Sequence, residues 1–295
     1  AHTLGFEKVG IAPATPLDSE ADRLDEWLHH GRHATMSWMA VRSDERKNIL
    51  NYFPEAKSVI CVGMNYFHGN ADGEMKISNY AWGDDYHVLL KERLYQLLES
   101  VKERLPDVTG VACVDTSPVM EKVWAQRAGL GWIGKHTNLI SRDYGSWLFL
   151  GELILDCELD YDDRFEEDLC GSCTACLDAC PTDAIVEDYL VDSRRCISYL
   201  TIEHRGDLPD EFAGQLGEWI YGCDICQEVC PWNQKFSQKS QEPLFAPTSE
   251  IVERNPEEWS RLTEEEYRRI FRNSPVKRAK FTGLKRNIQS VLSNS

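Results

Sequence analysis

The sequence predicts a fold that mixes helices and strands, α+β (α/β). A larger first domain precedes a small cysteine-rich domain and a short helical tail. Three observations predict it. Strand-like and helix-like segments alternate over the first 155 residues, eight of the eleven cysteines lie between Cys170 and Cys230, and an acidic stretch separates the two regions. A chain of 295 residues can bury more than one core. We expect domains at 1–160, 161–235 and 236–295.

The first domain is predicted from the period of its apolar residues. Continuous apolar runs are typical of buried strands, and apolar residues at helical spacing indicate an amphipathic helix. Ser117 is expected to cap a helix whose first residue is Pro118, and Gly129 is expected to end it. The expected strands cover residues 57–65, 108–115 and 147–155, and the expected long helix covers residues 85–105.

The cysteine-rich domain follows an acidic linker. Residues 156–168 hold eight acidic side chains and one arginine and show no periodicity. A helix is expected at residues 193–203, and a stretch rich in Pro, Ser and Gln at 233–247 leads into the tail. These changes in composition set the predicted domain boundaries.

Seven of the eight clustered cysteines form two iron–sulfur motifs. The first motif is Cys170-x2-Cys173-x2-Cys176-x3-Cys180-Pro181. This is the run of bacterial ferredoxins, in which the fourth cysteine ligates the other cluster. The second motif, Cys223-x2-Cys226-x3-Cys230-Pro231, is one cysteine short. Cys196, on the expected helix upstream, can supply the missing ligand.

The eight cysteines divide into two interlocked sets of four, which predicts two 4Fe-4S clusters. One cluster takes Cys170, Cys173, Cys176 and Cys230, and the other takes Cys180, Cys196, Cys223 and Cys226. Zinc sites or disulfides are the alternatives, but zinc favours paired C-x2-C units and suits the first run poorly. The remaining Cys61, Cys113 and Cys157 lie in apolar contexts and are expected to pack in the core.

Composition excludes some classes of protein. The most apolar stretch, residues 147–155, is too short to cross a membrane, and no signal peptide is visible. We therefore expect no membrane contact and a reducing, cytoplasmic location. The net charge of −17 argues against nonspecific nucleic-acid binding, yet residues 267–295 carry eight basic side chains and no acidic one.

Two features of the first domain are candidates for a site. Asp115 comes at the end of an expected strand, where a carboxyl group can act as an acid or base, or can merely cap the next helix. The stretch from Gly129 to His136 contains three glycines, which allow the backbone to approach a bulky ligand or simply form an ordinary loop. The residues alone leave both alternatives open.

The motifs taken together resemble the epoxyqueuosine reductase family over nearly the whole chain. The motifs that carry the resemblance are Tyr80-Ala-x-Gly-x-Asp-Tyr-His87, Val-Asp115-x-x-Pro, Ala-Gly-Leu-Gly-Trp-x-Gly-Lys-His136, Arg195-Cys-Ile-Ser-Tyr-Leu-Thr-Ile-Glu203 and Tyr221-Gly-Cys-Asp-x-Cys-Gln-x-x-Cys-Pro-Trp-Asn233. The family is similar to reductive dehalogenases. The resemblance implies a nitroreductase-like, cobalamin-binding catalytic domain followed by a ferredoxin-like domain with two 4Fe-4S clusters.

The resemblance also implies a reaction. Epoxyqueuosine at the wobble position of a tRNA anticodon stem-loop would lose its epoxide oxygen as water, taking up two electrons and two protons. The family's proposed proton donor corresponds to Asp115, which we then expect to be partly desolvated, with a raised pKa. The cobalamin contacts implied are Arg46, Tyr80, Asp115, Lys135, His136, Thr137, Asn138 and Leu139.

The resemblance further implies partners for the chain. A low-potential donor such as a ferredoxin or flavodoxin would supply electrons to a monomeric enzyme. The tail would bind tRNA phosphates through Lys277, Arg278, Lys280, Lys285 and Arg286. We also expect residues upstream of Ala1 and a helical-repeat region that begins in the tail. The alternatives are a cytoplasmic dehalogenase-like enzyme acting on a small organohalide, and a ferredoxin-type electron carrier without catalysis.

Overall fold

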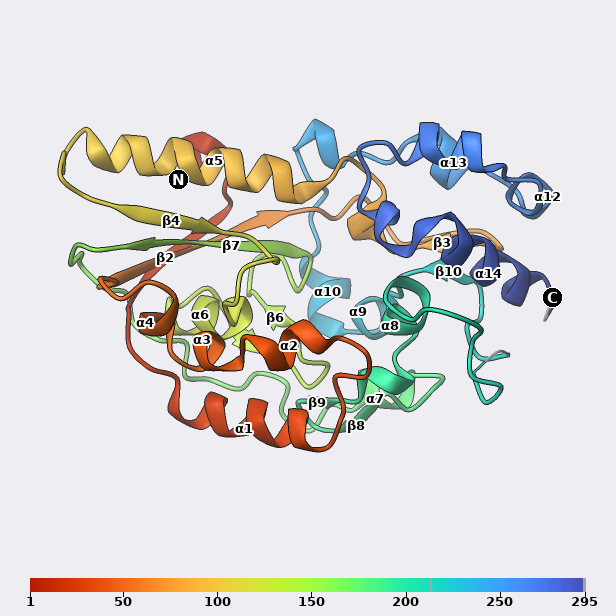
Figure 1. Cartoon of the computed structure of the whole chain (residues 1–295), viewed down its shortest axis with the longest axis horizontal. Helices are drawn as coiled ribbons and strands as arrows, with labels where there is room; N and C mark the ends of the chain where they lie inside the picture. Colours follow the sequence, from red (N-terminus) through yellow and green to blue (C-terminus); the bar gives the residue numbers. More distant parts are fainter. Residues whose placement is uncertain (213, 294–295) are drawn as a thin grey trace.

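The computed structural model describes residues 1–212 and 214–293, so the end of the predicted tail lies outside the described residues. A four-stranded sheet forms the centre of the first half of the molecule (Figure 1). Its order is β1-β2-β7-β4, and every neighbouring pair is antiparallel. The strands are β1 (Lys8–Pro13), β2 (Ser58–Asn65), β7 (Leu148–Leu155) and β4 (Gly110–Cys113).

Helices cover both faces of this sheet, which explains why its two inner strands are continuously apolar. All eight residues of β2 and all eight of β7 are buried. On one face α5 (Tyr86–Lys102) buries Leu90, Leu94 and Leu98 against the sheet. On the other face α6 (Glu121–Arg127) buries Val123 and Trp124, with α1 (Asp18–His29) farther out (Figure 1).

The structure confirms the three expected strands and the long helix, but not the expected start of the next helix. Helix α6 begins at Glu121 with Met120 as its N-cap, so the prediction that Ser117 and Pro118 begin it was wrong. The chain turns first: Asp115 has a left-handed backbone with a φ of 50°, and the Val119 amide donates to the Ser117 carbonyl. This turn delays the helix and leaves Asp115 on a loop.

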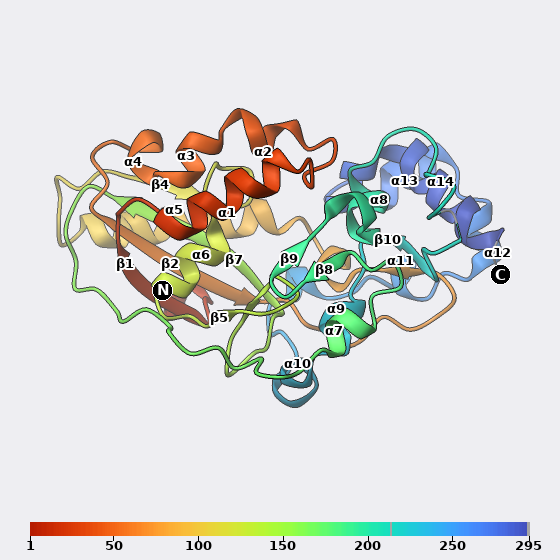
Figure 2. The same ribbon diagram turned by 90° about the horizontal axis from the view of Figure 1, so that it is seen from below.

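The cysteine-rich segment consists of short elements joined by loops, and it lies between the sheet and the tail helices (Figure 2). The helix expected at 193–203 is interrupted, because Cys196 has extended dihedrals (φ −73°, ψ 125°) between η3 and α8. Residues 156–168 form no helix or strand, as expected. The elements are α7 (Ala175–Asp178), β8 (Ile185–Glu187), β9 (Leu190–Val191), η3 (Ser193–Arg195), α8 (Ile197–Ile202), β10 (Trp219–Tyr221), α9 (Ile225–Glu228) and α10 (Pro231–Phe236).

The tail packs onto the cysteine-rich segment and shares its core. Asn287, fully buried on α14, donates from its amide to the carbonyls of Thr201 and Ile220. Strand β10 pairs in parallel with β3, which belongs to the first half of the chain. This core therefore crosses the expected domain boundaries, which remain a prediction. The tail contains η4 (Pro243–Phe245), α11 (Ser249–Val252), α12 (Pro256–Ser260), α13 (Glu264–Ile270), η5 (Pro275–Ala279) and α14 (Lys280–Leu292).

The remaining elements are short and connect these layers. Among the described residues, none of the helices is both long and apolar enough to cross a membrane. The short elements are η1 (His2–Leu4), α2 (Ser37–Val41), α3 (Ser43–Lys47), α4 (Ile49–Tyr52), β3 (Lys76–Ile77), η2 (Asn79–Ala81), β5 (Trp132–Ile133) and β6 (Leu139–Ile140).

Candidate active site and cluster cavities

Two cavities lie where the cysteine-rich segment meets the sheet, and each is lined by four cysteines. The larger, which we call cavity 1, has a volume of about 390 Å³, and the smaller, cavity 2, about 210 Å³. Cavity 1 is lined by Cys180, Cys196, Cys223 and Cys226, and cavity 2 by Cys170, Cys173, Cys176 and Cys230. The structure thus brings together the same two sets of four that the spacing predicts.

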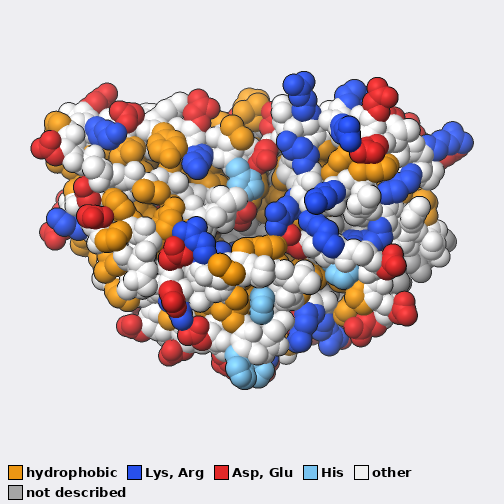
Figure 3. All heavy atoms as spheres, in the orientation of Figure 1, with side chains coloured by type: hydrophobic (Ala, Val, Ile, Leu, Met, Phe, Trp, Pro, Cys, Tyr) orange, Lys and Arg blue, Asp and Glu red, His pale blue; other side chains and the backbone are white. Residues whose placement is uncertain are grey.

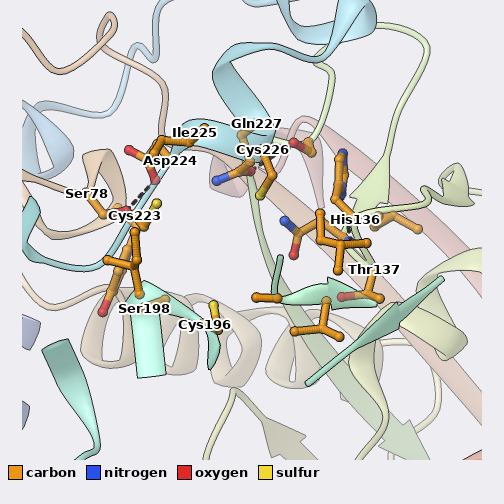
Figure 4. Close-up of a pocket in the computed structure, with 18 of the residues that line it drawn as sticks. Ser78, His136, Thr137, Cys196, Ser198, Cys223, Asp224, Ile225, Cys226 and Gln227 are labelled. Atoms are coloured by element: carbon orange, nitrogen blue, oxygen red, sulfur yellow. Dashed lines mark hydrogen bonds between the residues drawn. The ribbon is translucent and has the colours of Figure 1, made fainter. Parts of the chain in front are cut away.

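Local backbone geometry places the cysteines of cavity 1. Cys226 lies on α9 and Cys196 in the break before α8, and Figure 4 shows both side chains in the same space as Cys223. Gly222 has a φ of 67°, and a Cβ there would lie 2.4 Å from the Cβ of Ser78. Glycine therefore lets the Cys223 loop approach the segment that carries Ser78.

The cysteine chemistry of both cavities fits iron–sulfur clusters. All eleven cysteines are free thiols, so disulfides do not compete for them. Burial raises the pKa of the Cys223 and Cys196 thiols. A thiolate in these surroundings is costly unless iron compensates its charge. Among residues 1–212 and 214–293, no group of three or more His, Cys, Asp or Glu side chains is placed to bind a single metal ion.

A chain of hydrogen bonds joins three side chains at the rim of cavity 1. His87 lies between two carboxylates, with its Nε2 3.0 Å from Asp115 Oδ2 and its Nδ1 2.6 Å from Asp85 Oδ1. Burial disfavours the charged form of His87, but the hydrogen bonds to Asp115 and Asp85 outweigh burial and raise its pKa to about 9. His87 is therefore an imidazolium at neutral pH, and it holds Asp115 in place.

Asp115 itself is more exposed than expected. Its side chain is 57% exposed and does not line cavity 1, so the expectation of a partly desolvated carboxyl was wrong. The reason is the turn after β4, which lifts Asp115 to the rim. Its backbone amide donates to the carboxylate of Glu121, the first residue of α6.

Glu121 is the residue that sequence reasoning missed. It lines cavity 1, and burial raises its pKa to about 8, with the negative charge of Asp115 acting in the same direction. The sequence offered one weak signal, a carboxylate six residues after Asp115 at a position where a helix could begin. Its burial depends on how α6 packs beside the cavity, which the sequence does not reveal.

The glycine-containing loop supplies one wall of cavity 1. His136, Thr137, Asn138 and Leu139 all line it, and Figure 4 shows His136 and Thr137 across the cavity from Cys223. Lys135 is not brought to this wall: it lines cavity 2, and its ammonium lies 3.0 Å from the carboxylate of Asp188.

His136 points an unsatisfied donor into this region. Its Nδ1 accepts from the Asn138 amide at 3.1 Å, which leaves the proton on Nε2. Nε2 is buried and finds no hydrogen-bond partner in the part of the chain that the structure describes. Burial, aided by the charge of Lys122, lowers the pKa of His136 to about 4, so the ring is neutral. A bound polar group would satisfy this donor.

The other expected cobalamin contacts lie on opposite sides of the site. Tyr80 lines cavity 1, and its hydroxyl donates to Tyr221 at 3.0 Å. Arg46 is buried on α3 and donates to the Ser117 carbonyl at 3.4 Å, so it supports the Asp115 loop from outside the cavity.

Basic side chains of η5 lie beside the rim. The Asp85 amide donates to the Asn273 carbonyl, and the Tyr221 hydroxyl donates to the Pro275 carbonyl at 2.8 Å, which anchors η5 near the His87 chain. Arg278 bonds to Glu203 at 2.7 Å and stacks 4.9 Å from the ring centre of Trp38. In Figure 3, Lys and Arg side chains gather on the tail side of a hollow in this face.

The five expected tRNA contacts differ in their availability. Lys277, Arg278 and Lys280 are exposed. Lys285 instead donates to the carbonyls of Ser260 and Leu262. Arg286 donates to three backbone carbonyls, those of Leu200, His204 and Gly206. Lys285 and Arg286 therefore stabilise the packing of the tail, and only the first three are presented to a partner.

Two family models match the chain. A model described as "4Fe-4S double cluster binding domain" matches residues 169–233, and one described as "Epoxyqueuosine reductase QueG" matches residues 46–116. The epoxyqueuosine reductase of Cellulophaga algicola is 46% identical over 290 residues, which cover 98% of this chain and 94% of that protein. The prediction of two clusters in the cysteine-rich domain is therefore confirmed.

Solved structures share the fold. An epoxyqueuosine reductase with an epoxyqueuosine-modified tRNA-Tyr stem loop has a TM-score of 0.88 and 30% identity, over 99% of this chain and 79% of that chain. The enzyme from Bacillus subtilis, with its catalytic aspartate loop swung out of the active site, has a TM-score of 0.88 and 29% identity over the same shares. The expected fold class is confirmed.

Proposed function

The chain belongs to the epoxyqueuosine reductase family of oxidoreductases, and from that premise we propose that it reduces epoxyqueuosine to queuosine in the anticodon loop of tRNA. In this proposal electrons pass through two 4Fe-4S clusters to cobalamin in cavity 1. The observation that carries the proposal is the composition of cavity 1, in which four cysteines face the glycine-containing loop and a proton-holding carboxyl group.

We assign the cluster ligands as the two cavities divide them. Cys180, Cys196, Cys223 and Cys226 hold the cluster nearer the substrate, and Cys170, Cys173, Cys176 and Cys230 hold the other. The second cluster receives electrons from a ferredoxin or flavodoxin. Glu121 and the tyrosines of the first domain line cavity 1 and not cavity 2, which supports this order.

Cavity 1 also suits a large cofactor. Tyr80, Tyr86 and Phe149 give it an apolar wall, and the unsatisfied donor of His136 faces it from the glycine-containing loop. In our proposal Thr137, Asn138 and Leu139 hold cobalamin with these residues. When bound, reduced cobalamin supplies the nucleophile that opens the epoxide.

Asp115 gives a proton to the epoxide oxygen as its bond to carbon breaks. The carboxyl is held at the rim by His87 and lies on a turn rather than in a helix; movement of this turn would bring it over the substrate. The catalytic aspartate loop of the Bacillus subtilis enzyme, which is swung out of its active site, supports a mobile role for this loop.

The anticodon stem-loop enters beside η5. Lys277, Arg278 and Lys280 are exposed near the rim and would contact its phosphates, while the modified base turns into cavity 1. The solved complex of a relative with a modified tRNA stem loop supports this partner. Basic side chains gathered beside the hollow would allow RNA to bind despite a net charge of −17.

The test is a reconstitution under anaerobic conditions with iron, sulfide, cobalamin and a low-potential reductant. Mass spectrometry of digested tRNA should detect loss of one oxygen from epoxyqueuosine. Conversion of a small organohalide, with no change in the tRNA by fully loaded protein, would contradict the proposal and favour a dehalogenase-like activity.

A further inference from the structure

The reaction consumes two protons, and the site holds two neighbouring carboxyl groups. Resting on the proposed function, the balance is epoxide plus two electrons and two protons, giving alkene and water. The oxygen takes one proton when its first carbon–oxygen bond breaks. It takes a second when the other carbon–oxygen bond breaks and it leaves as water. The electrons come from the external low-potential donor, but a single aspartate carries only one of the protons.

The second of these carboxyl groups belongs to Glu121. It is the first residue of α6 and lines cavity 1, whereas Asp115 lies above it at the rim. The hydrogen bond from the Asp115 amide to the Glu121 carboxylate fixes the Asp115 loop relative to α6. The two carboxyl groups are therefore coupled by the backbone, with one at the mouth and one at the wall.

The neighbours of Glu121 do not neutralise it by an ion pair. Lys122, on the same helix, extends toward the glycine-containing loop and donates to Asn138 Oδ1 at 3.0 Å. Arg46, on α3, donates to Ser117, and His87, on α5, is bonded to the two aspartates. Among residues 1–212 and 214–293, no ion pair within 4.0 Å reaches Glu121.

Burial and the charge of Asp115 favour the protonated form of Glu121 and outweigh the Asp115 amide and the positive charges of Lys122 and His87, which lower its pKa. Tyr86, on α5, lines the same cavity as Glu121. Glu152, fully buried on β7 and outside the cavity, is kept neutral by its own burial and adds no charge beside Glu121. Burial is the main cause that raises the pKa of Glu121 to about 8. At neutral pH the carboxyl group of Glu121 is therefore mostly protonated.

We propose that Glu121 is a second catalytic acid, which gives the oxygen its second proton as it leaves as water. Asp115 gives the first at the rim, passing on a proton that it takes from the His87 imidazolium, and Glu121 gives the second from the cavity wall. Both then reload from solvent. His87 is partly exposed and bonded to Asp115, so it offers a route for the proton of Asp115.

The variant that tests this role is Glu121→Gln. Glutamine keeps an oxygen to accept the Asp115 amide, so the loop stays in place, but it has no acidic proton to give. We expect single-turnover loss of oxygen from tRNA to slow by about 10²–10⁴-fold, the usual contribution of a general acid. Glu121→Asp, which keeps the acid on a shorter side chain, should recover part of this loss.

The matched control is Glu152→Gln, which makes the same chemical change in a buried carboxyl outside the cavity. Its rate should stay within about twofold of the wild type, because a neutral amide replaces a group that burial already keeps neutral. Cluster absorbance and thermal unfolding of each variant establish that it is folded and loaded.

A second readout needs neither cobalamin nor tRNA. Infrared difference spectra of cluster-loaded protein between about pH 6 and about pH 10 should show a carboxylic acid that ionises near pH 8. The signal should vanish in Glu121→Gln and persist in Glu152→Gln. A Glu121→Gln enzyme with the wild-type rate and pH profile would overturn the proposal, as would an infrared signal unchanged by this substitution. Failure of the wild type to convert tRNA would instead overturn the proposed function.

Discussion

The two cavities have equal numbers of cysteines but different surroundings. Cavity 2 is lined mainly by the cysteine-rich loops and Trp232, with Lys135, His136 and Ile140 from the first domain. Cavity 1 adds the end of β7, the tyrosines of the first domain and Glu121. Among the described residues His136 alone lines both. The comparison teaches that two similar cluster motifs can differ in task through what the first domain adds. In our proposal one cavity relays electrons, and the other joins them to protons and substrate.

Cysteine substitutions should separate these tasks, and they carry the largest expected effect. Cys226→Ser should remove the cluster of cavity 1, halve the bound iron and abolish turnover with any reductant. Cys173→Ser should lose the same amount of iron but keep the cluster of cavity 1. Its turnover should fail with a protein donor and return in part with a small-molecule reductant. Iron analysis and the tRNA assay measure both. Identical behaviour of the two variants would remove the distinction between the cavities.

Asp115→Asn should give the next largest effect. Removing a general acid is expected to slow turnover by about 10²–10⁴-fold while cluster and cobalamin content remain unchanged. Asparagine keeps an oxygen that can accept from His87, so the rim stays ordered. Absorbance of the loaded protein provides the control for cofactor content. Full turnover by this variant would show that the proton comes only from the cavity wall.

The basic rim should contribute to affinity more than to chemistry. Lys277→Ala combined with Lys280→Ala should weaken tRNA binding and reduce the slope of log K against log salt by about 2, since each lysine releases about one counterion. The matched control is Lys285→Ala, a basic residue of the same tail whose ammonium is bonded to carbonyls. It should lower thermal stability and leave the salt slope unchanged. Equal salt slopes in the wild type, the double variant and Lys285→Ala would exclude this surface as the RNA site.

The smallest effect is on stability against pH. A histidine with a raised folded pKa stabilises the fold fully below its unfolded pKa of about 6.5, and this contribution is lost as pH rises through about 9. We expect the exposed Asp115 to limit it to roughly 1–2 kcal/mol through solvent screening. Denaturation of His87→Gln should therefore show a flatter loss of stability between these pH values than the wild type. Parallel curves would mean that the hydrogen bonds of His87 with Asp85 and Asp115 contribute nothing to the free energy of unfolding.

The cysteine sets could be predicted because spacing within a ferredoxin run determines which thiols point to which cluster. Cys196 lines the same cavity as the rest of its predicted set, even though the helix expected around it is interrupted. The strands were predictable for a similar local reason, since β2 and β7 are buried on both faces and read as continuous apolar runs.

The surroundings of the two carboxyl groups, Asp115 and Glu121, could not be predicted in the same way. The exposure of Asp115 depends on a left-handed turn, and the pKa of Glu121 depends on the packing of α6 beside the cavity. The internal contacts of Lys285 and Arg286 likewise arise from the packing of α14 against distant segments. A charge count cannot distinguish such side chains from those of Lys277 and Lys280.

The most direct test of the account is the tRNA assay on one preparation of cluster-loaded protein, divided into portions with and without cobalamin. Mass spectrometry would follow the single oxygen that epoxyqueuosine loses. The account predicts loss of this oxygen only in the portion with cobalamin, and none in either portion of Cys226→Ser. Equal conversion without cobalamin would contradict the account, because the clusters and carboxyl groups of cavity 1 would then suffice.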